Sequence, residues 1–283
     1  MLKRTRSTIV AVLSGALLVL GAGVAPAVGV EAASAGADRA LGTGGGAPAG
    51  SDDPESQEAA DEISPMIVGG TRATSSRGMA LVMVGDRPAC SGSIVHNRWV
   101  LTAKHCVMYD KNGDGRDDTK HPPGALTVRV KSLNLASGGG VVQVSLTKVR
   151  TNHDVALLKL NRSANAEPVR LASAGPKLFT ETYAFGWGET CLNCAMSPYL
   201  KRSTQRVSGA STDSWGGEAI RTNGVNGYVC FGDSGGPLFK LVDGKRYQVG
   251  LLSSGDRSCG GGANHYSSVP QSKAWIEDVI ARF

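Results

Sequence analysis

The sequence has few long apolar runs, and this shortage excludes a protein anchored by several membrane-spanning helices. Only residues 9–20 form such a run; basic side chains precede it at residues 3–6, and the small residues Ala25 and Ala27 follow it. This arrangement is typical of a secretory signal peptide, and its apolar core is too short for a good membrane anchor. We therefore predict a signal peptide over residues 1–27, a secreted, extracellular product, and no membrane partner.

Residues 28–66 lack the large apolar side chains that a folded segment buries. The stretch is rich in Gly, Ala and Ser, and acidic residues accumulate between positions 52 and 62. Such a composition cannot bury enough apolar surface to offset the loss of chain entropy. We predict an acidic, Gly/Ala-rich pro-segment here, followed by one folded region over residues 67–283.

Aromatic residues are also scarce, at 5% of the chain. From Ile67 onward, 26 Lys and Arg stand against 16 Asp and Glu, an excess of 10 positive charges. These charges are scattered and are not interleaved with aromatic residues, whereas a nucleic-acid-binding surface gathers them in a patch or stripe. We expect no nucleic-acid partner and interpret the excess charge as an aid to solubility.

Helical periodicity is missing from most of the chain after Ile67. Short apolar or alternating runs, bounded by Gly, Asn and Asp, predict β-strands instead. The expected strands cover residues 79–84, 91–95, 99–103, 126–131, 141–149, 155–160, 182–187, 200–207, 218–221, 237–242, 247–253 and 265–269. Two groups of six predict an all-β fold of two antiparallel six-stranded barrels, over about residues 67–172 and 173–283. Only residues 271–283 have helical spacing, which predicts a short C-terminal helix docked on the second barrel.

A serine, Ser234, lies in the stretch Gly-Asp-Ser-Gly-Gly-Pro (residues 232–237). A serine hydroxyl is a poor nucleophile at neutral pH and needs an adjacent base and a group that orients the base. His105 and Asp154 can supply both. Taken singly, His105 could be a histidine buried beside a disulfide and Asp154 a cap at a strand end; together with Ser234 they favour nucleophilic catalysis. The order His, Asp, Ser matches one serine hydrolase architecture and excludes two others.

Four motifs carry a resemblance to a known family: Ile-Val-Gly-Gly (67–70), Leu-Thr-Ala-Lys-His-Cys (101–106), Asp-Val-Ala-Leu-Leu (154–158) and Gly-Asp-Ser-Gly-Gly-Pro (232–237). Together they resemble the trypsin/chymotrypsin family of serine endopeptidases, and the precursor looks like a secreted bacterial member. The resemblance implies that Ser234 is the nucleophile, that His105 is the general base and then acid, and that Asp154 orients the imidazole. It also implies hydrolysis of protein or peptide substrates through an acyl-enzyme, no required cofactor, and a monomer.

The resemblance implies further roles for the residues around Ser234. The backbone N–H groups of Gly232 and Ser234 would form the oxyanion hole. Asp233 would receive the α-ammonium of Ile67 after an activating protease cuts before that residue, so the precursor would be an inactive zymogen. The cut would follow Met66, whereas many relatives are cut after Lys or Arg, so a tryptic activator is not expected.

All six cysteines lie in the part of the chain expected to be exported, and an even number in such a protein predicts disulfides. Six cysteines allow 15 pairings from sequence alone. The resemblance implies the pairs Cys90–Cys106 and Cys230–Cys259. Cys191 and Cys194 depart from the common family pattern, and we expect a local bridge between them; a redox motif or metal site would need a matching second half.

The expected specificity pocket departs from the trypsin pattern. In the family, an aspartate six residues before the nucleophile selects Lys or Arg, and here that residue is Tyr228. Without a carboxylate to offset its burial, a long cation is disfavoured. Ser253, Gly255 and Asn264 are expected to form the other walls. We predict small or uncharged side chains before the cut bond, while Asp256 leaves a basic preference open.

One loop has the pattern D-x-N-x-D-G-x-x-D, in which Asp110, Asn112, Asp114 and Asp118 present oxygens around a glycine turn, as in calcium loops. His121 stands at the twelfth position, where a calcium loop of the EF-hand type places glutamate. A structural calcium ion and a plain solvated loop therefore both remain open.

Two alternatives to a peptidase come from other classes. Residues 232–236 also satisfy G-x-S-x-G, the nucleophile elbow of α/β-hydrolase esterases, but that fold needs a helix after the serine and partners in the order Ser, Asp, His. A catalytically silent relative that acts by binding is the second alternative, and Tyr228 in the pocket is the residue that favours it.

Overall fold

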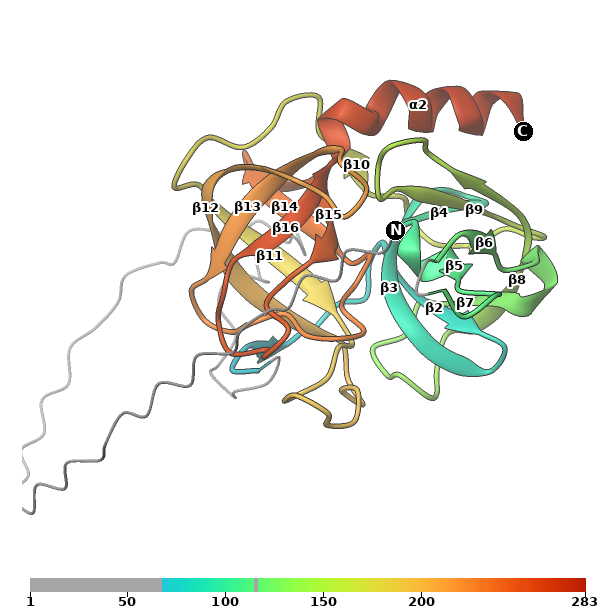
Figure 1. Cartoon of the computed structure of the whole chain (residues 1–283), viewed down its shortest axis with the longest axis horizontal. Helices are drawn as coiled ribbons and strands as arrows, with labels where there is room; N and C mark the ends of the chain where they lie inside the picture. The colour runs from blue at the N-terminus through green and yellow to red at the C-terminus, as the bar shows by residue number, and fades with distance from the viewer. Residues whose placement is uncertain (1–67, 115–116) are drawn as a thin grey trace, which may run out of the picture. The chain divides into compact units, whose positions relative to one another are not determined.

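A computed structural model describes residues 68–114 and 117–283 (Figure 1). The predicted signal peptide, the predicted pro-segment and Ile67 lie outside these residues. The strands are β1 (Thr71–Arg72), β2 (Met79–Val84), β3 (Arg87–His96), β4 (Trp99–Thr102), β5 (Met108–Tyr109), β6 (Thr119–Lys120), β7 (Leu126–Val130), β8 (Gly140–Val149), β9 (Ala156–Leu160), β10 (Arg170–Leu171), β11 (Glu181–Gly186), β12 (Lys201–Thr212), β13 (Glu218–Gly224), β14 (Pro237–Val242), β15 (Lys245–Ser254) and β16 (Asn264–Ser268). The helices are two short 3-10 turns, His105–Val107 and Pro123–Ala125, and α2 (Val269–Arg282).

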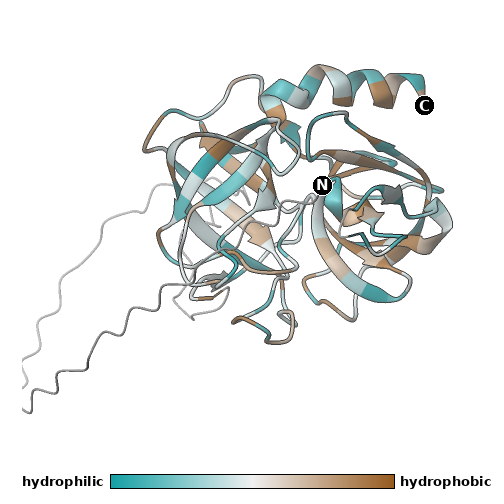
Figure 2. Cartoon of the chain, viewed as in Figure 1, coloured by the Kyte–Doolittle hydropathy of each residue, from teal (hydrophilic) through white to brown (hydrophobic). Residues whose placement is uncertain are grey.

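The first barrel closes in the strand order β2-β3-β4-β9-β8-β7, with antiparallel neighbours. Its strands alternate inward and outward residues, as β7 shows: Leu126, Val128 and Val130 are buried, and the two residues between them are partly exposed. Figure 2 shows this mixture of hydrophobic and hydrophilic positions along the ribbons. The interior is a single apolar cluster that includes Trp99 and Leu157.

The second barrel contains β11, β12, β13, β16, β15 and β14, and the pairing of β12 with β13 closes it. Two short strands flank this barrel: β1 pairs with β12, and β10 pairs in parallel with β15. The prediction of two six-stranded antiparallel barrels is therefore confirmed. The two-residue strands were not predicted, because so short a pairing leaves no period in the sequence.

The interior of the second barrel is partly polar. Gln205, in β12, donates to Ser203 Oγ at 2.8 Å and accepts hydrogen bonds from Thr222 Oγ1 and Asn264 Nδ2, both at 3.1 Å. All four side chains are buried. Buried polar groups are tolerated when they satisfy one another in this way, and the network positions Asn264 near the site described below.

Helix α2 contacts both barrels. It packs on β15 and β10, but its buried residues Val269, Ile276 and Val279 belong to the apolar cluster of the first barrel. Arg150, which follows β8, also donates to Ser272 Oγ of the helix at 2.7 Å. The prediction that the helix docks on the second barrel is therefore confirmed by its contacts with β15 and β10. Its contact with the first barrel was not predicted, because helical spacing shows which face is apolar but not which surfaces cover it.

The two barrels also contact each other directly. Met79 and Leu81 of β2 share an apolar cluster with Phe185 and Trp187 of the second barrel. The β3 backbone reaches the loop before β14, because the Ser91 N–H donates to the Ser234 carbonyl at 2.8 Å. These contacts fix the positions of residues from one barrel relative to residues from the other.

Candidate active site

Two hydrogen bonds join a histidine and an aspartate of the first barrel. His105 opens the 3-10 turn after β4, and Asp154 lies between β8 and β9. The His105 backbone N–H donates to Asp154 Oδ1 at 2.9 Å, and ring Nδ1 lies 2.7 Å from Oδ2. The Asp154 side chain is fully buried, whereas that of His105 is 27% exposed. The carboxylate therefore orients a ring that still reaches solvent.

Asp154 is stabilised in its charged form despite its burial. Burial acts to raise the pKa of Asp154, but hydrogen bonds from His105 and Ser253 and the charge of the imidazole outweigh it, so the pKa is held below its ordinary value. Ser253 Oγ, at the end of β15, donates to Asp154 Oδ2 at 2.6 Å. A carboxylate that stays ionised can stabilise an imidazolium beside it.

Ser234 and His105 line the same cavity, which has a volume of about 560 Å³. The other lining residues are Asp117, Ser214, Trp215, Val229, Cys230, Phe231, Leu252, Ser253, Ser254, Gly255, Asp256 and Arg257. Within the described residues, no hydrogen bond joins Ser234 Oγ to the His105 ring. Catalytic hydrogen bonds commonly tighten only when a substrate is bound.

The loop before Ser234 presents two backbone donors. Gly232 has φ +91°, a backbone conformation that favours glycine, and a Cβ on it would lie 2.7 Å from Met196 Cε, so the methionine side chain would have to move. Ser91 Oγ donates to the Gly232 carbonyl at 3.1 Å and turns that oxygen toward β3. In the described part of the chain, the N–H groups of Gly232 and Ser234 donate to no protein acceptor. They are free to bind an oxygen from outside.

Asp233 points into the protein, away from Ser234. Its carboxylate accepts hydrogen bonds from the N–H groups of Gly188 at 2.7 Å and Cys230 at 3.0 Å. A Cβ on Gly186 or Gly188 would collide with this carboxylate. Burial raises the pKa of Asp233 to about 6, although both amides and nearby Lys201 oppose the rise. The carboxylate thus lies in a site where an added cation would be strongly stabilising.

Lys201 is a buried cation near Asp233. Its side chain is 1% exposed, and among the described residues its Nζ has no hydrogen-bond partner. Burial lowers the pKa of Lys201 to about 8, against the attraction of Asp233. The predicted partner of Asp233, Ile67, lies outside the described residues. The next residue, Val68, accepts a hydrogen bond from the Tyr228 N–H at 2.9 Å, so the chain after Ile67 is attached to the second barrel.

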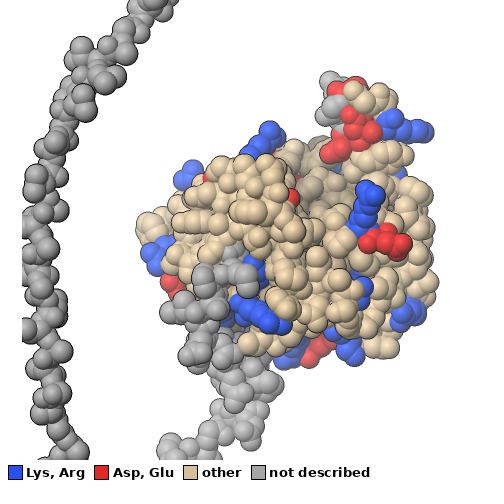
Figure 3. All heavy atoms as spheres, turned by 90° about the horizontal axis from the view of Figure 1, so that it is seen from below, with Lys and Arg blue, Asp and Glu red and all other residues tan. Residues whose placement is uncertain are grey.

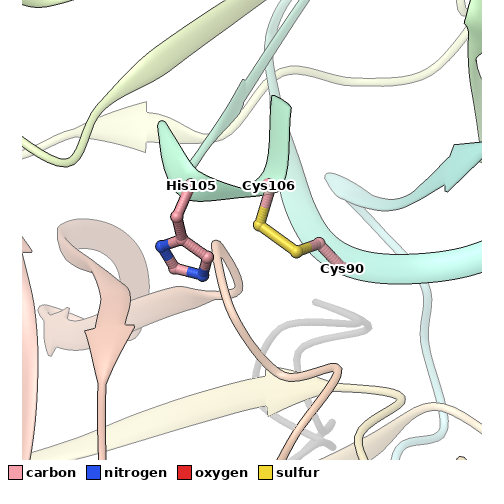
Figure 4. A group of neighbouring side chains, drawn as sticks. All are labelled: Cys90, His105 and Cys106. Atoms are coloured by element: carbon pink, nitrogen blue, oxygen red, sulfur yellow. A yellow bond between two sulfur atoms is a disulfide. The ribbon is translucent and has the colours of Figure 1, made fainter. Parts of the chain in front are cut away.

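The structure contains the three expected disulfides, Cys90–Cys106, Cys191–Cys194 and Cys230–Cys259. Cys106 and His105 come from the same helical turn, and the bridge fixes that turn to β3 (Figure 4). The sulfurs of Cys90 and Cys106 lie close enough to the His105 ring to suggest a metal site. Because both sulfurs are in the disulfide, they offer no thiolates for a metal.

The structure brings two of the predicted pocket residues, Ser253 and Gly255, to the cavity wall. Asn264 lies behind that wall, since a Cβ on Gly255 would be 2.8 Å from Asn264 Oδ1. The Tyr228 ring packs against Gly224 and Gly261, and its neighbour Val229 lines the cavity. A residue's place in the chain thus does not fix the direction of its side chain.

Asp256 lies at the cavity wall, but its carboxylate is bound within its own loop. It accepts hydrogen bonds from the hydroxyl and N–H of Ser258 and from the N–H groups of Gly260 and Gly262. These bonds, those to Ser258 first, lower the pKa of Asp256 to about 2. The carboxylate is therefore bound within its own loop, and a role for Asp256 in selecting basic side chains stays a prediction.

The predicted calcium loop is only partly within the described residues, because residues 115–116 fall outside. Asp110 Oδ1 accepts hydrogen bonds from the N–H groups of Gly113 at 2.7 Å and Asp114 at 3.3 Å, and Asn112 Nδ2 donates to Asp114. Asp118 accepts from the Thr119 hydroxyl. These contacts fit a tight solvated turn, and calcium binding by the loop stays a prediction.

Sequence reasoning missed the turn between β12 and β13. Asp213 accepts a hydrogen bond from the Asp154 N–H at 2.9 Å, and Trp215 of the same turn lines the cavity. Lys104, next to His105, places its Nζ 3.4 Å from the centre of the Trp215 ring. An aspartate between two strands looks like any solvated turn residue. The one feature of the sequence that could have pointed to this turn was Lys104, a lysine within the mostly buried motif of residues 101–106.

Comparison with known proteins agrees with this geometry. The family model described as Trypsin matches residues 67–276. Among relatives, human chymotrypsin-like elastase family member 1 is 28% identical over 78% of this chain and 94% of its own length. CLIP domain-containing serine protease B4 of Anopheles gambiae is 26% identical over 68% of this chain, which spans only 62% of that relative. Rat vitamin K-dependent protein C is 28% identical, and the chain spans 54% of it.

Solved structures have the same fold. Human heparin binding protein aligns with a TM-score of 0.63 at 22% identity, over 77% of this chain and 98% of its own. Neuropsin, a serine protease expressed in the limbic system of mouse brain, aligns with a TM-score of 0.60 at 25% identity, over 75% of this chain and 98% of its own.

The chain belongs to the trypsin family. The relatives named above are animal proteins, so the comparisons give no support to the expected bacterial type. An α/β-hydrolase esterase is excluded, because the fold is all-β. Among the described residues, no helix is long and apolar enough to cross a membrane. On the face shown in Figure 3, Lys and Arg side chains are dispersed among uncharged residues.

Proposed function

We propose that this protein is a secreted serine endopeptidase that hydrolyses peptide bonds with His105, Asp154 and Ser234. One observation carries the proposal: the His105 ring, bound to buried Asp154, shares a cavity with Ser234. A trypsin-family chain that acted only by binding would not need to maintain this arrangement. Relatives named as serine proteases support the same chemistry.

In the proposed mechanism, Ser234 Oγ attacks the carbonyl carbon of the substrate while His105 Nε2 removes the hydroxyl proton. Asp154 holds the ring through Nδ1 and stabilises the imidazolium without taking its proton. The carbonyl oxygen becomes an oxyanion that accepts hydrogen bonds from the N–H groups of Gly232 and Ser234. His105 then gives its proton to the leaving amine, which leaves an acyl-enzyme on Ser234. A water molecule, deprotonated by His105, hydrolyses that ester.

We further propose that the substrate residue before the cut bond is small or uncharged. The cavity walls next to Ser234 include Val229, Ser253 and Gly255, which carry no charge. Asn264 closes the space behind Gly255. The carboxylate of Asp256 is bound within its own loop, so it is not available to offset the burial of a lysine or arginine side chain. Strong preference for Lys or Arg in a peptide library would contradict this part.

Activation by a cut before Ile67 is proposed on the surroundings of Asp233. A new α-ammonium there would pair with a carboxylate that, among residues 68–114 and 117–283, accepts hydrogen bonds from two backbone amides, and it would fix the loop that holds Gly232. The activating protease would need to accept Met66. The signal peptide over residues 1–27 and the pro-segment over residues 28–66 remain part of this proposal.

A fluorophosphonate probe tests the proposed function directly, because it labels only an activated serine. The full chain cut before Ile67 should take up one equivalent, on Ser234, and should hydrolyse peptides. The Ser234→Ala and His105→Ala variants should take up none. If the cut chain is folded and takes no more label than Ser234→Ala, the protein is a silent relative that acts by binding.

A further inference from the structure

The turn between β12 and β13 reaches across to the catalytic aspartate from the second barrel. Asp213, in this turn, is 6% exposed, and its carboxylate is saturated with hydrogen bonds. Oδ2 accepts from the Asp154 N–H and from Ser267 Oγ, both at 2.9 Å. Oδ1 accepts from the N–H groups of Trp215 and Gly217, both at 2.9 Å. One side chain therefore fixes its own turn and the backbone of Asp154.

The same turn also reaches the Asp154 carboxylate through a hydroxyl. The Ser214 N–H donates to Ser253 Oγ at 3.0 Å, and Ser253 Oγ in turn donates to Asp154 Oδ2 at 2.6 Å. Ser214 Oγ lies 3.0 Å from the same hydroxyl. The Ser214 N–H occupies one lone pair of the Ser253 hydroxyl, and the shorter of the two contacts open to the hydroxyl proton is the one to Asp154. The turn thus orients Asp154 at its backbone and at its side chain.

Two buried carboxylates this close together require a compensating positive charge. Lys104 is 9% exposed, and its ammonium lies on the Trp215 ring, within the field of both Asp154 and Asp213. Burial lowers the pKa of Lys104, and the two carboxylates oppose that change. A cation on an aromatic face keeps its charge with less loss of solvation than in an apolar pocket.

We propose that Asp213 and Lys104 are positioning residues of the catalytic site: Asp213 fixes Asp154, and Lys104 balances the charge of the two carboxylates. The proposal rests on the peptidase function proposed above. Neither side chain needs to touch substrate. Their effect passes through Asp154 to the His105 ring, so it should appear in turnover and in its pH dependence more than in substrate affinity.

The charges around this group define the expected pH effects. Besides Asp154 and His105, the charged or titratable side chains that face Asp213 are Lys104, Arg150, and the ring of His153 beside Gly217. Lys104→Met removes a positive charge near the His105 ring, so the ring should hold its proton to higher pH. Asp213→Asn removes a negative charge and should act in the opposite direction.

The test uses the full chain cut before Ile67, with kcat and KM measured from pH 5 to 10. For Asp213→Asn we expect kcat to fall by roughly 10–100-fold with KM within about threefold, because a misplaced triad member affects the transition state more than substrate binding. The acid limb of the kcat/KM profile should move to lower pH in Asp213→Asn and to higher pH in Lys104→Met. Lys104→Arg keeps the charge and should restore the wild-type profile.

Two variants elsewhere serve as matched controls. Lys148 also places its Nζ 3.4 Å from an aromatic centre, that of Phe283, and among the described residues it has no hydrogen bond or ion pair with Asp154 or Asp213. Asp243 is an exposed aspartate in the turn between β14 and β15. Lys148→Met and Asp243→Asn should leave kcat and the pH profile unchanged. A structural effect alone would lower the thermal midpoint of Asp213→Asn without moving the profile, and that result would overturn the proposal.

A second readout does not depend on turnover. The proton between His105 Nδ1 and Asp154 Oδ2 should give a downfield NMR signal in the wild-type chain, shifted or lost in Asp213→Asn. If the wild-type chain proves inactive but this signal responds as expected, the peptidase function fails and the positioning role stands. If the chain is active and neither the signal nor the pH profile responds, the positioning role fails alone.

Discussion

The two barrels share a strand topology but differ in what they bury. The first barrel has an apolar interior of residues such as Trp99 and Leu157, and it carries His105 and Asp154 at its edge. The second barrel buries the Gln205 network and the ionisable pair Lys201 and Asp233 beneath the loop of Ser234. Apolar packing is insensitive to pH, whereas buried charges and their hydrogen bonds are not.

This difference assigns separate tasks to the barrels. The histidine and aspartate are held by a barrel with an apolar interior, whose stability comes from hydrophobic packing. The nucleophile, its backbone donors and the cavity walls rest on the polar barrel, where a change of charge or of one hydrogen bond can alter the shape of the site. We expect substitutions in the apolar interior of the first barrel to change mainly stability, and substitutions around the cavity on the second barrel to change activity or specificity.

Outside the triad itself, the largest expected effect is at the oxyanion loop of the second barrel. Gly232→Ala places a methyl group against Met196 and strains a backbone with φ +91°. Displacing one oxyanion donor should lower kcat by roughly 10²–10³-fold. Steady-state peptide hydrolysis measures this. Gly244 also has positive φ, +73°, with open space around it, so Gly244→Ala should leave kcat unchanged. Equal losses in the two variants would show that strain alone is responsible.

Cavity formation in the first barrel should affect stability instead. Leu157 is fully buried, and Leu157→Ala should lower the free energy of unfolding by about 2–5 kcal/mol. Urea unfolding measures the loss, and kcat/KM at 25 °C should change less than about threefold, because Leu157 belongs to the barrel's apolar cluster and does not line the cavity. In contrast, Gln205→Leu leaves Asn264 without its partner and should change the preferred substrate side chain. A changed preference for the substrate side chain in Leu157→Ala would contradict the proposed difference between the two barrels.

The buried charges of the second barrel predict a pH dependence for the uncut chain. Because the folded pKa of Asp233, about 6, is above its ordinary 3.8, the folded state binds more protons between these values, and stability should fall as pH rises from about 4 to about 6. The full loss is about 3 kcal/mol. Thermal unfolding of the uncut Ser234→Ala chain measures it, and adding Asp233→Asn should flatten the fall.

Lys201 should make the stability of the uncut chain rise with pH in the alkaline range, opposite to the effect of Asp233. Its folded pKa, about 8, is below the ordinary 10.5, so the folded state binds fewer protons and stability should rise between these values. Lys201→Met in the same uncut chain should remove that rise. A pH-independent stability in both ranges would show that these charges are compensated within the fold.

The smallest effect is expected at an exposed ion pair of the second barrel. Arg206 and Glu181 lie 3.2 Å apart across β12 and β11, and both are about half exposed. Solvent screens such a pair, so Arg206→Ala should change the free energy of unfolding by less than about 1 kcal/mol. Urea unfolding at low and high salt checks this. A larger, salt-independent loss would mean that surface charge, and not only buried charge, distinguishes this barrel.

Most of the fold could be predicted from the sequence because strand residues leave a period. The runs at residues 79–84 and 237–242 match β2 and β14 in both bounds. The two-residue strands and the contact of the helix with the first barrel could not be predicted, because pairing and packing between distant segments are not local properties. The triad residues could be named because their motifs are local, although no prediction specified the two bonds between His105 and Asp154.

The pocket and the β12–β13 turn show where sequence reasoning ends. Tyr228 could be placed in the chain, but the direction of its ring depends on space beside Gly224 and Gly261. Asp213 gave no signal, because an aspartate in a turn is common in any β protein. Its importance depends on a contact with Asp154, which comes from the other barrel.

The central claim is that an imidazole of the first barrel activates a hydroxyl of the second. The most direct measurement is the rate of peptide hydrolysis by the cut chain, compared with its Ser234→Ala and His105→Ala variants at equal concentration. Each variant should lose roughly 10⁶-fold in kcat, and the double variant should lose no more, because the residues act as a unit. Hydrolysis that persists in Ser234→Ala at the wild-type rate would contradict the account.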